Sequence, residues 1–405
     1  MAAREARLAL ILLALLAALA CAPLGAQAPA STTAPPSATP VPAEATATAA
    51  RPAATATQAP ATDTPEPSPT AEITLVPADT PTPPTPAPAA STDLGRGRRE
   101  PAPRAAIVAP PNWEVQVIDY QRDAQAWALL RAMDEASAAA PSGWEYVLIR
   151  AHVKCTYAGA DAHEIDAFSF GLTGDRLWRY FPVANATLDP ILDAELRAGE
   201  ETEGWVAFLA HQGEGSLMLI FEEWMSGNDF GSRYIALDDG ASLAVDPALE
   251  AIKPTGTGAS LDAPAPLGEK AVTRGWEVTA LEVARGEAAR AMAQSASDFN
   301  FPPAKGMEYI AVRLRVRRID VPIGSGDSGY TMDSNYFTTT GSAGVAYEPP
   351  MLLAPEPRLD AMLYAGGEVE GWAVYQIGTG ETKPVLVFEP FLVPSPGDTR
   401  YLSLE

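Results

Sequence analysis

Two long stretches of this 405-residue chain repeat each other in register, and this duplication limits the possible folds more than any other feature. Before about Cys155 the repeated motifs lie 163 residues apart, and after about Phe168 they lie 167 apart, so one net insertion of four residues explains both offsets. We therefore expect two copies of one module, at 112–240 and 268–405, joined by a linker at 241–267. The matching motifs are Trp113-Glu114-Val115 with Trp276-Glu277-Val278, 143–147 with 306–310, Glu203-Gly204-Trp205 with Glu370-Gly371-Trp372, Phe221-Glu222 with Phe388-Glu389, and Arg233-Tyr234 with Arg400-Tyr401.

Each module has the alternating pattern of β-strands. Apolar and polar side chains alternate over 147–153 and again over 310–316, which is typical of strands with one face against a core. Gly199 and Gly366 supply turns just before further strand-like runs, because glycine adopts positive φ at little cost. Several short strands within about 130 residues predict a mostly β fold, with two tandem antiparallel β-sandwiches of immunoglobulin-like type.

One segment of each module favours a helix instead. Residues 122–140 are rich in helix formers, and Trp127, Leu130 and Met133 are spaced to form one apolar stripe. The counterpart at 286–297 is shorter in apolar content. We expect a helical insertion after the first strand of each module, with its stripe capping an open end of the sandwich. We also expect Trp113, Trp205, Trp276 and Trp372 to lie in the cores.

The first residues are typical of an export signal. Arg4 and Arg7 precede the apolar run 8–20, and small residues at 18–20 resemble a cleavage site. The run is too short to cross a bilayer, which needs roughly 20 residues as a helix. Residues 1–21 are therefore predicted to be a signal peptide. Because Cys21 follows the small residues directly, the stretch resembles a bacterial lipobox with Ala18 in place of the usual leucine, and this favours a lipid anchor on Cys21 over a plain cut.

Residues 22–111 are dominated by proline, alanine and threonine. Such a composition buries too little apolar surface to offset the entropy lost on ordering, so a disordered, extended linker is expected. Threonine and proline repeats also suit O-glycosylation.

Charge and cysteine content exclude several classes. The net charge is −23, and only −1 of it falls within residues 1–111, so the predicted modules carry an acidic surface. Nucleic-acid binding needs clustered lysine and arginine, so we expect no nucleic-acid binding. Two cysteines exclude a disulfide-rich scaffold.

The repeated motifs resemble a known family. The segments around Trp276, Gly306 to Val312 and Gly366 to Trp372, with their first-copy counterparts, are similar to immunoglobulin-like modules of bacterial lipoproteins and surface proteins. That family is a domain-of-unknown-function class labelled with a telomeric-repeat-binding-factor-like fold. The resemblance implies two extracytoplasmic β-sandwiches and implies no catalytic residue.

A metal or triad site has few candidate residues. His152, Cys155 and His163 are the types that zinc favours, but His152 and Cys155 are three apart on one strand and so point to opposite faces. A buried thiol beside a surface histidine is the better interpretation. With three histidines in the chain and no glycine-flanked serine elbow, no nucleophilic triad is predicted.

Carboxylates offer two weaker candidates. Glu203 and Glu222 recur as Glu370 and Glu389, a pair that resembles glycosidase chemistry by type but is more simply explained by contacts at strand ends. Asp320, Asp327 and Asp333 lie in a loop rich in glycine and serine, where calcium is conceivable but a solvated loop is favoured. We predict no catalytic residue, no cofactor and no metal.

These features predict a non-enzymatic bacterial protein that is exported and either anchored at the cell surface or secreted. Its tandem modules would serve binding, adhesion or envelope structure, with an unknown protein or glycan partner at the envelope and a membrane contact through Cys21. The alternative is a hydrolase or an accessory subunit acting on envelope polymers.

Overall fold

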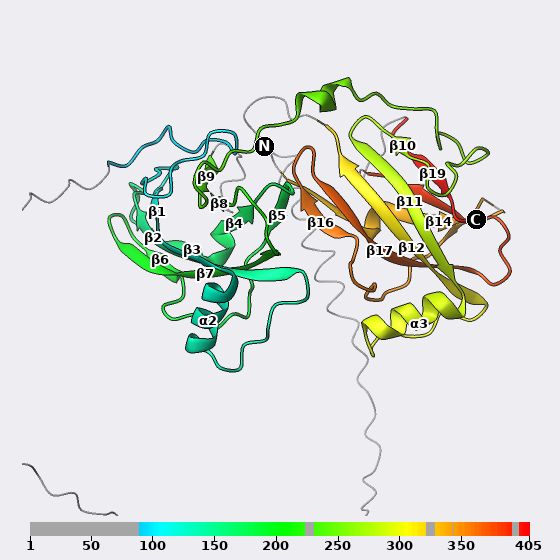
Figure 1. Ribbon diagram of the computed structural model, residues 1–405, viewed down its shortest axis with the longest axis horizontal. Coiled ribbons are helices and arrows are strands. Elements are labelled where there is room, and N and C mark those ends of the chain that lie inside the picture. The colour runs from blue at the N-terminus through cyan, green and yellow to red at the C-terminus, as the bar shows by residue number, and fades with distance from the viewer. Residues whose placement is uncertain (1–88, 223–230, 321–328, 343, 391–396) are drawn as a thin grey trace, which may run out of the picture. The chain divides into compact units, whose positions relative to one another are not determined.

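A computed structural model describes residues 89–222, 231–320, 329–342, 344–390 and 397–405. All of them belong to one compact unit, Thr82–Glu405. The predicted signal peptide, Cys21 and most of the predicted linker therefore lie outside the described residues. The described part is mostly antiparallel β-structure, as the alternating pattern predicts (Figure 1). None of its helices has the length and apolar character needed to span a bilayer.

The first half is a β-sandwich. Strands β1, β2 and β7 form one sheet, and β5, β4, β8 and β9 lie in the facing sheet. One core cluster joins both layers, with Trp113 and Ile149 from the first and Phe170 and Phe221 from the second. The elements are β1 (Trp113–Arg122), α2 (Asp123–Met133), β2 (Trp144–Cys155), β3 (His163–Asp166), η1 (Ala167–Ser169), β4 (Phe170–Thr173), β5 (Trp178–Tyr180), β6 (Asp193–Leu196), β7 (Glu201–His211), β8 (Met218–Phe221) and β9 (Arg233–Ala236).

The second half follows the same strand order. Strands β11, β12 and β17 face β15, β14, β18 and β19 across a second core. The elements are η4 (Pro247–Ala251), β10 (Ala271–Val272), β11 (Trp276–Arg285), α3 (Glu287–Ala296), β12 (Met307–Arg318), β13 (Tyr330–Asp333), η5 (Ser334–Tyr336), β14 (Phe337–Thr340), β15 (Ala346–Tyr347), β16 (Asp360–Leu363), β17 (Glu368–Gly378), β18 (Val385–Phe388) and β19 (Arg400–Ser403).

Strand register agrees between the halves in detail. The β1–β2 ladder shifts between Val117 and Asp119, and the β11–β12 ladder shifts between Ala280 and Glu282, which are the same positions at an offset of 163. Two strands also join the halves, because β16 pairs with β5 through Met362 and Leu363. The result is one six-stranded sheet in the order β13-β16-β5-β4-β8-β9.

The two helices follow the first strand of each half, as predicted, but they cover a sheet face and do not cap an open end. In β2 the side chains of Tyr146 and Leu148 point away from the sandwich core, since neighbours on a strand face opposite ways. They are buried with Ala126 and Leu130 of α2. Helix α2 therefore lies on the outside of β2 and β7 (Figure 1), and it ends at Met133, before the predicted Ala140.

Both predicted linkers include residues at their C-terminal ends that belong to the sandwiches. Residues 89–111 were expected to be disordered, yet Ala102 is fully buried, and its N–H donates to the Tyr234 carbonyl at 2.8 Å. In the 241–267 segment, Ala265 is buried and donates in the same way to Tyr401. Proline content is the reason for the error, because prolines flank each alanine but the alanine itself keeps a free N–H for the sheet.

A backbone crossing fixes one glycine in each half. A Cβ on Gly204 would lie 2.4 Å from the Leu192 backbone nitrogen, and one on Gly371 would lie 2.3 Å from the Arg358 carbonyl. Real Cβ atoms do not approach backbone so closely, so the repeated Glu-Gly-Trp motif marks a place where a segment passes directly over the strand.

We predict that Gly371→Ala destabilises the full chain by on the order of 2–3 kcal/mol, because the added methyl forces the backbone at 358–359 away from β17. Urea unfolding followed by tryptophan fluorescence measures the change. Gly256→Ala is the matched control, since no atom lies within 4 Å of its added Cβ. Equal unfolding midpoints for the two variants would contradict the crossing.

Candidate functional site

Aromatic side chains gather at one end of the first sandwich. Trp144 begins β2, Trp178 and Tyr180 lie on β5, and His211 ends β7. The His211 ring lies 4.2 Å from the Trp144 ring and 4.7 Å from the Trp178 ring, measured between centroids. Because three strands each bring one part of this cluster, the sandwich itself sets its geometry. We call Trp144, Trp178 and His211 the aromatic trio.

A buried carboxyl group lies beneath the trio. Glu214 is only 3% exposed; it accepts the Tyr180 hydroxyl and the backbone N–H of Arg176. The Tyr180 oxygen lies 3.0 Å from Nδ1 of His211, so the three side chains form one hydrogen-bonded chain. Burial raises the pKa of Glu214 to about 7, and burial with the nearby Arg176 charge lowers the pKa of His211 to about 4.

The second half keeps only part of this arrangement. At an offset of 167, Tyr347 and Glu381 take the places of Tyr180 and Glu214, and their side chains are again hydrogen-bonded, at 2.9 Å. Backbone N–H groups of Lys383 and Ser342 lower the pKa of Glu381 to about 2, the opposite of Glu214. The tyrosine–glutamate pair therefore serves the fold in both halves.

The aromatic trio has no counterpart in the second half. The equivalent positions hold Met307, Val345 and Gly378. Since the strands and the tyrosine–glutamate pair are shared, the sandwich does not need an aromatic side chain at these positions. The trio is a property of the first half alone, which marks it as a candidate for recognition.

The aromatic trio opens onto a cavity of about 450 Å³, which we call the aromatic cavity. Most charges in its wall are paired: Arg313 with Glu370 at 2.5 Å, and Arg358 with Glu356 at 2.8 Å. Two exposed side chains, Arg176 and Asp360, make no ion pair within the described residues. The lining residues are Trp144, Arg176, Trp178, His211, Arg313, 356–358, Asp360, Glu368 and Glu370.

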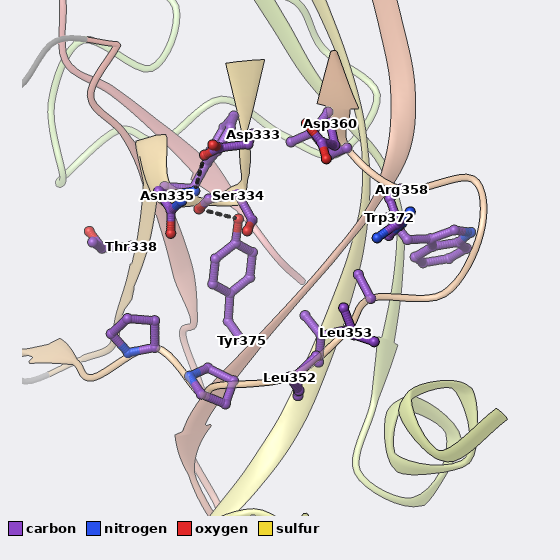
Figure 2. Close-up of a pocket in the computed structure, with 16 residues that line it drawn as sticks. Asp333, Ser334, Asn335, Thr338, Leu352, Leu353, Arg358, Asp360, Trp372 and Tyr375 are labelled. Atoms are coloured by element: carbon purple, nitrogen blue, oxygen red, sulfur yellow. Dashed lines mark hydrogen bonds between the residues drawn. The ribbon is translucent and has the colours of Figure 1, made fainter. Parts of the chain in front are cut away.

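A second cavity of about 300 Å³, the loop cavity, adjoins the first and shares Arg358 and Asp360 with it. Figure 2 shows Tyr375 of β17 in its middle, with Leu352 and Leu353 on a loop along one side and Arg358 beside Trp372. Another part of its wall comes from residues 333–338, where Asp333 caps the short helix η5 through the Asn335 N–H. The two cavities together form the candidate site.

Asp360 lies at the point where the two cavities meet. It faces Asp333 across the β13–β16 ladder. Burial raises the pKa of Asp360, the Arg358 charge opposes the rise, and the charges of Asp333 and Glu356 add to it. The same opposition recurs in the first half as Asp166 and Asp193.

The residues considered for a zinc site are not brought together as one. Cys155 is a buried free thiol on the core side of β2, as predicted. His152 faces outward, with Nε2 at 3.6 Å from a Glu201 oxygen. His163 packs against the Tyr157 ring at 4.1 Å.

The carboxylate pairs are separated as well. Glu203 lies on β7 and pairs with Arg150 at 2.6 Å, whereas Glu222 follows β8 in the facing sheet and pairs with Arg179 at 2.6 Å. Glu370 pairs with Arg313 and Arg315. The Glu389 backbone N–H donates to the Tyr336 carbonyl.

The loop aspartates have separate partners. Asp320 pairs with Arg318 at 2.6 Å, Asp333 caps η5, and Asp327 lies outside the described residues. Across the described ranges, no cluster of histidine, cysteine and carboxylate side chains has the geometry of a metal site.

Sequence reasoning missed the aromatic trio and was wrong about one tryptophan. Trp113 and Trp276 lie in the two sandwich cores, and Trp205 is buried beneath α2, but Trp372 is only partly buried and lines the loop cavity. The available signal was the difference between the copies: motifs kept in both mark the fold, and Trp144 against Met307 marks a departure.

No family model matches the sequence, and no curated protein shows a significant match. Similar crystal structures include a candidate lipoprotein, ycdA, of Bacillus subtilis (13% identity, TM-score 0.24, 32% of this chain) and the B. subtilis yjhA protein (14%, 0.25, 35%). A third is an uncharacterized β-sandwich protein of Clostridium difficile (11%, 0.22, 35%). This chain spans 37% of the length of the first structure, 98% of the second and 96% of the third.

We predict that Glu214 makes the fold less stable as pH rises. Its folded-state pKa of about 7 is above the usual 4.5, so the stability that the protonated carboxyl contributes is fully present below pH 4.5 and is lost as pH rises through 7. Glu214→Gln mimics the protonated group. In the wild type, ionisation of Glu214 should lower the free energy of unfolding by on the order of 2–3 kcal/mol between pH 5 and 8. Urea unfolding of the variant should not show this fall.

Glu381→Gln is the matched control, because the pKa of Glu381 is lowered. Its stabilising contribution is present above pH 4.5 and lost as pH falls toward 2, so the variant should be less stable than the wild type at pH 7. Parallel pH profiles for both variants would contradict the assignment.

Proposed function

We propose that this chain is an exported, non-enzymatic bacterial surface protein whose β-sandwich head binds a component of the cell envelope at the candidate site. The observation that carries the proposal is the aromatic trio. It lines a cavity, it is absent from the equivalent place in the second half, and the shared fold does not require it. Concave sites that combine aromatic surface with convergent polar groups are a common form of binding site.

We further propose that the two halves are copies of one immunoglobulin-like module of the lipoprotein and surface-protein type. The same strand order, the same register shift and the same glycine crossing support this. Such modules present loops and end cavities on a rigid frame, which suits binding or adhesion.

Catalysis is the alternative, and one observation favours it. The pKa values of Glu214 and His211 are shifted in opposite directions beside a cavity, as in many active sites. However, the Glu214 carboxyl group is bonded to the Arg176 backbone and to Tyr180, and the same bonding pattern recurs at Glu381. A carboxyl group used in this way in both halves supports the fold, so we favour binding over hydrolysis of envelope polymers.

We expect lipid attachment at Cys21 to hold the protein at the membrane. Cys21→Ser should therefore move it from the membrane fraction to the medium, because one missing diacylglycerol removes the apolar anchor. Fractionation with immunoblotting measures this, and mass spectrometry of the mature N-terminus detects the lipid. Cys155→Ser is the control, since that thiol is buried in the core. Unchanged fractionation of Cys21→Ser would contradict the anchor.

We predict that Arg176→Glu weakens binding of the purified full chain to envelope fragments of the producing cell at least tenfold. Arg176 is the exposed cation of the aromatic cavity without an ion pair in the described part of the chain, and reversing its charge places a second unpaired acid in the wall beside Asp360. Co-sedimentation at graded fragment concentrations gives the affinity.

Arg197→Glu is the matched control, because Arg197 is exposed on the same half but does not line the cavity. Retained binding in this control with loss in Arg176→Glu supports the site. Equal loss in both variants would show general repulsion and would contradict it.

A further inference from the structure

We propose that the candidate site binds sugar rings of an envelope polysaccharide, with one ring in the aromatic cavity and the next in the loop cavity. This inference rests on the proposed binding function and names the ligand class.

The indoles provide the first part of the argument. The Nε1–H of Trp178 already donates to the Glu368 carbonyl at 2.7 Å, so the polar atom of this indole is satisfied within the protein. What Trp178 offers a ligand is apolar aromatic surface. The C–H face of a pyranose ring packs well on such surface, because its weakly positive hydrogens meet the negative π-face of the ring.

The charged groups provide the second part. The pairs Arg313–Glu370 and Arg358–Glu356 place donors and acceptors side by side in the wall. A sugar hydroxyl donates and accepts at once, so it can bind to such a pair without leaving either charge unmatched. A ligand with one net charge would instead compete for one member of each pair.

The two groups without ion pairs complete the fit. Arg176 offers donors and Asp360 offers acceptors at the same cavity. His211 adds no positive charge near neutral pH, since its pKa is lowered to about 4. The cavity therefore presents mixed, nearly balanced hydrogen-bonding groups around aromatic surface, which matches a neutral polyhydroxylated ring.

The adjoining loop cavity indicates a ligand longer than one ring. It meets the aromatic cavity at Arg358 and Asp360, and it has its own tryptophan, Trp372, in its wall. Two neighbouring cavities, each with aromatic surface and sharing polar groups, suit successive units of a polymer. A cavity of about 450 Å³ lies within the range of small-molecule sites.

Selective destruction of the envelope tests the ligand class. Envelope fragments are treated with periodate, which cleaves the vicinal diols of sugars, or with a protease, and binding of the full chain is measured by co-sedimentation. We expect periodate to reduce binding at least tenfold and protease to leave it unchanged. Loss after protease with binding kept after periodate would overturn the saccharide inference and leave the proposed function standing. No binding to untreated fragments would overturn both.

Variants locate the binding. Asp360→Asn and Trp144→Phe should each weaken binding of soluble polysaccharide released from the fragments by fivefold or more, measured by tryptophan fluorescence titration. Asp193→Asn and Met307→Leu are the matched controls. Asp193 is the counterpart of Asp360, Met307 is the counterpart of Trp144, and neither residue lines either cavity. Unfolding curves confirm that each variant folds. Binding that is equal in the site variants and the controls would overturn the assignment to these cavities.

Discussion

The candidate site depends on a contact between two backbone segments. Residues 357–359 pass over β17 at Gly371 so closely that no side chain fits between them. Backbone hydrogen bonds hold the crossing on both sides, from Trp372 to the Pro357 carbonyl at 2.7 Å and from Leu359 to the Trp372 carbonyl at 3.0 Å. This crossing places Arg358 and Asp360 where the two cavities meet. The same crossing at Gly204 carries no such charged pair, because Ile191 stands in the place of Arg358.

Much of the frame could be predicted from the sequence, because backbone contacts accept few alternative residues. Arg233 and Arg400 belong to a motif that both halves share. Their buried guanidinium groups donate to the carbonyls of Thr92 and Thr255 respectively. A buried cation needs such acceptors, so its position is strongly fixed. These same bonds tie the segments expected to be linkers into each sandwich. Composition hid this, since proline-rich sequence is typical of disorder even where one alanine N–H enters a sheet.

The aromatic trio could not be predicted in the same way. Trp144, Trp178 and His211 are dispersed over the first half, and no motif spacing links them. They meet only because the beginnings of β2 and β5 and the end of β7 lie at one place. The tryptophans of strands were expected in the core, and this expectation is correct for Trp113 and Trp276, whose side chains face the opposite sheet. Trp205 and Trp372 both sit on the outer face of their strands, outside the sandwich cores, but Trp205 is buried with α2 whereas Trp372 is only partly buried.

The outer faces of the sheets show how charge and apolar surface are separated. Helices α2 and α3 cover part of each face, and beyond them the strands carry cross-strand ion pairs. Arg150 pairs with Glu203 in the first half, and Arg313 pairs with Glu370 at the equivalent place. Exposed pairs of this kind add little stability, but they keep an edge soluble. In the second half the same ion pair also forms part of the aromatic cavity wall, so one cross-strand pair belongs to both the sheet surface and the candidate site.

Glu214 and Glu381 occupy equivalent positions in the two halves but differ in burial and in pKa. Both carboxyl groups accept a tyrosine hydroxyl and a backbone N–H at the same turn, yet burial raises the pKa of one to about 7, while backbone N–H groups lower the pKa of the other to about 2. The turn itself therefore works with a partly exposed, ionised glutamate. Glu214 is buried next to the hydrogen-bonded side chains of Tyr180 and His211. This burial lowers the stability of the fold at neutral pH, and the second half folds without it. The aromatic trio lies above this carboxyl group in the first half alone, and the second half keeps the tyrosine–glutamate pair without it. This asymmetry of the aromatic side chains is the reason to propose recognition at Trp144, Trp178 and His211.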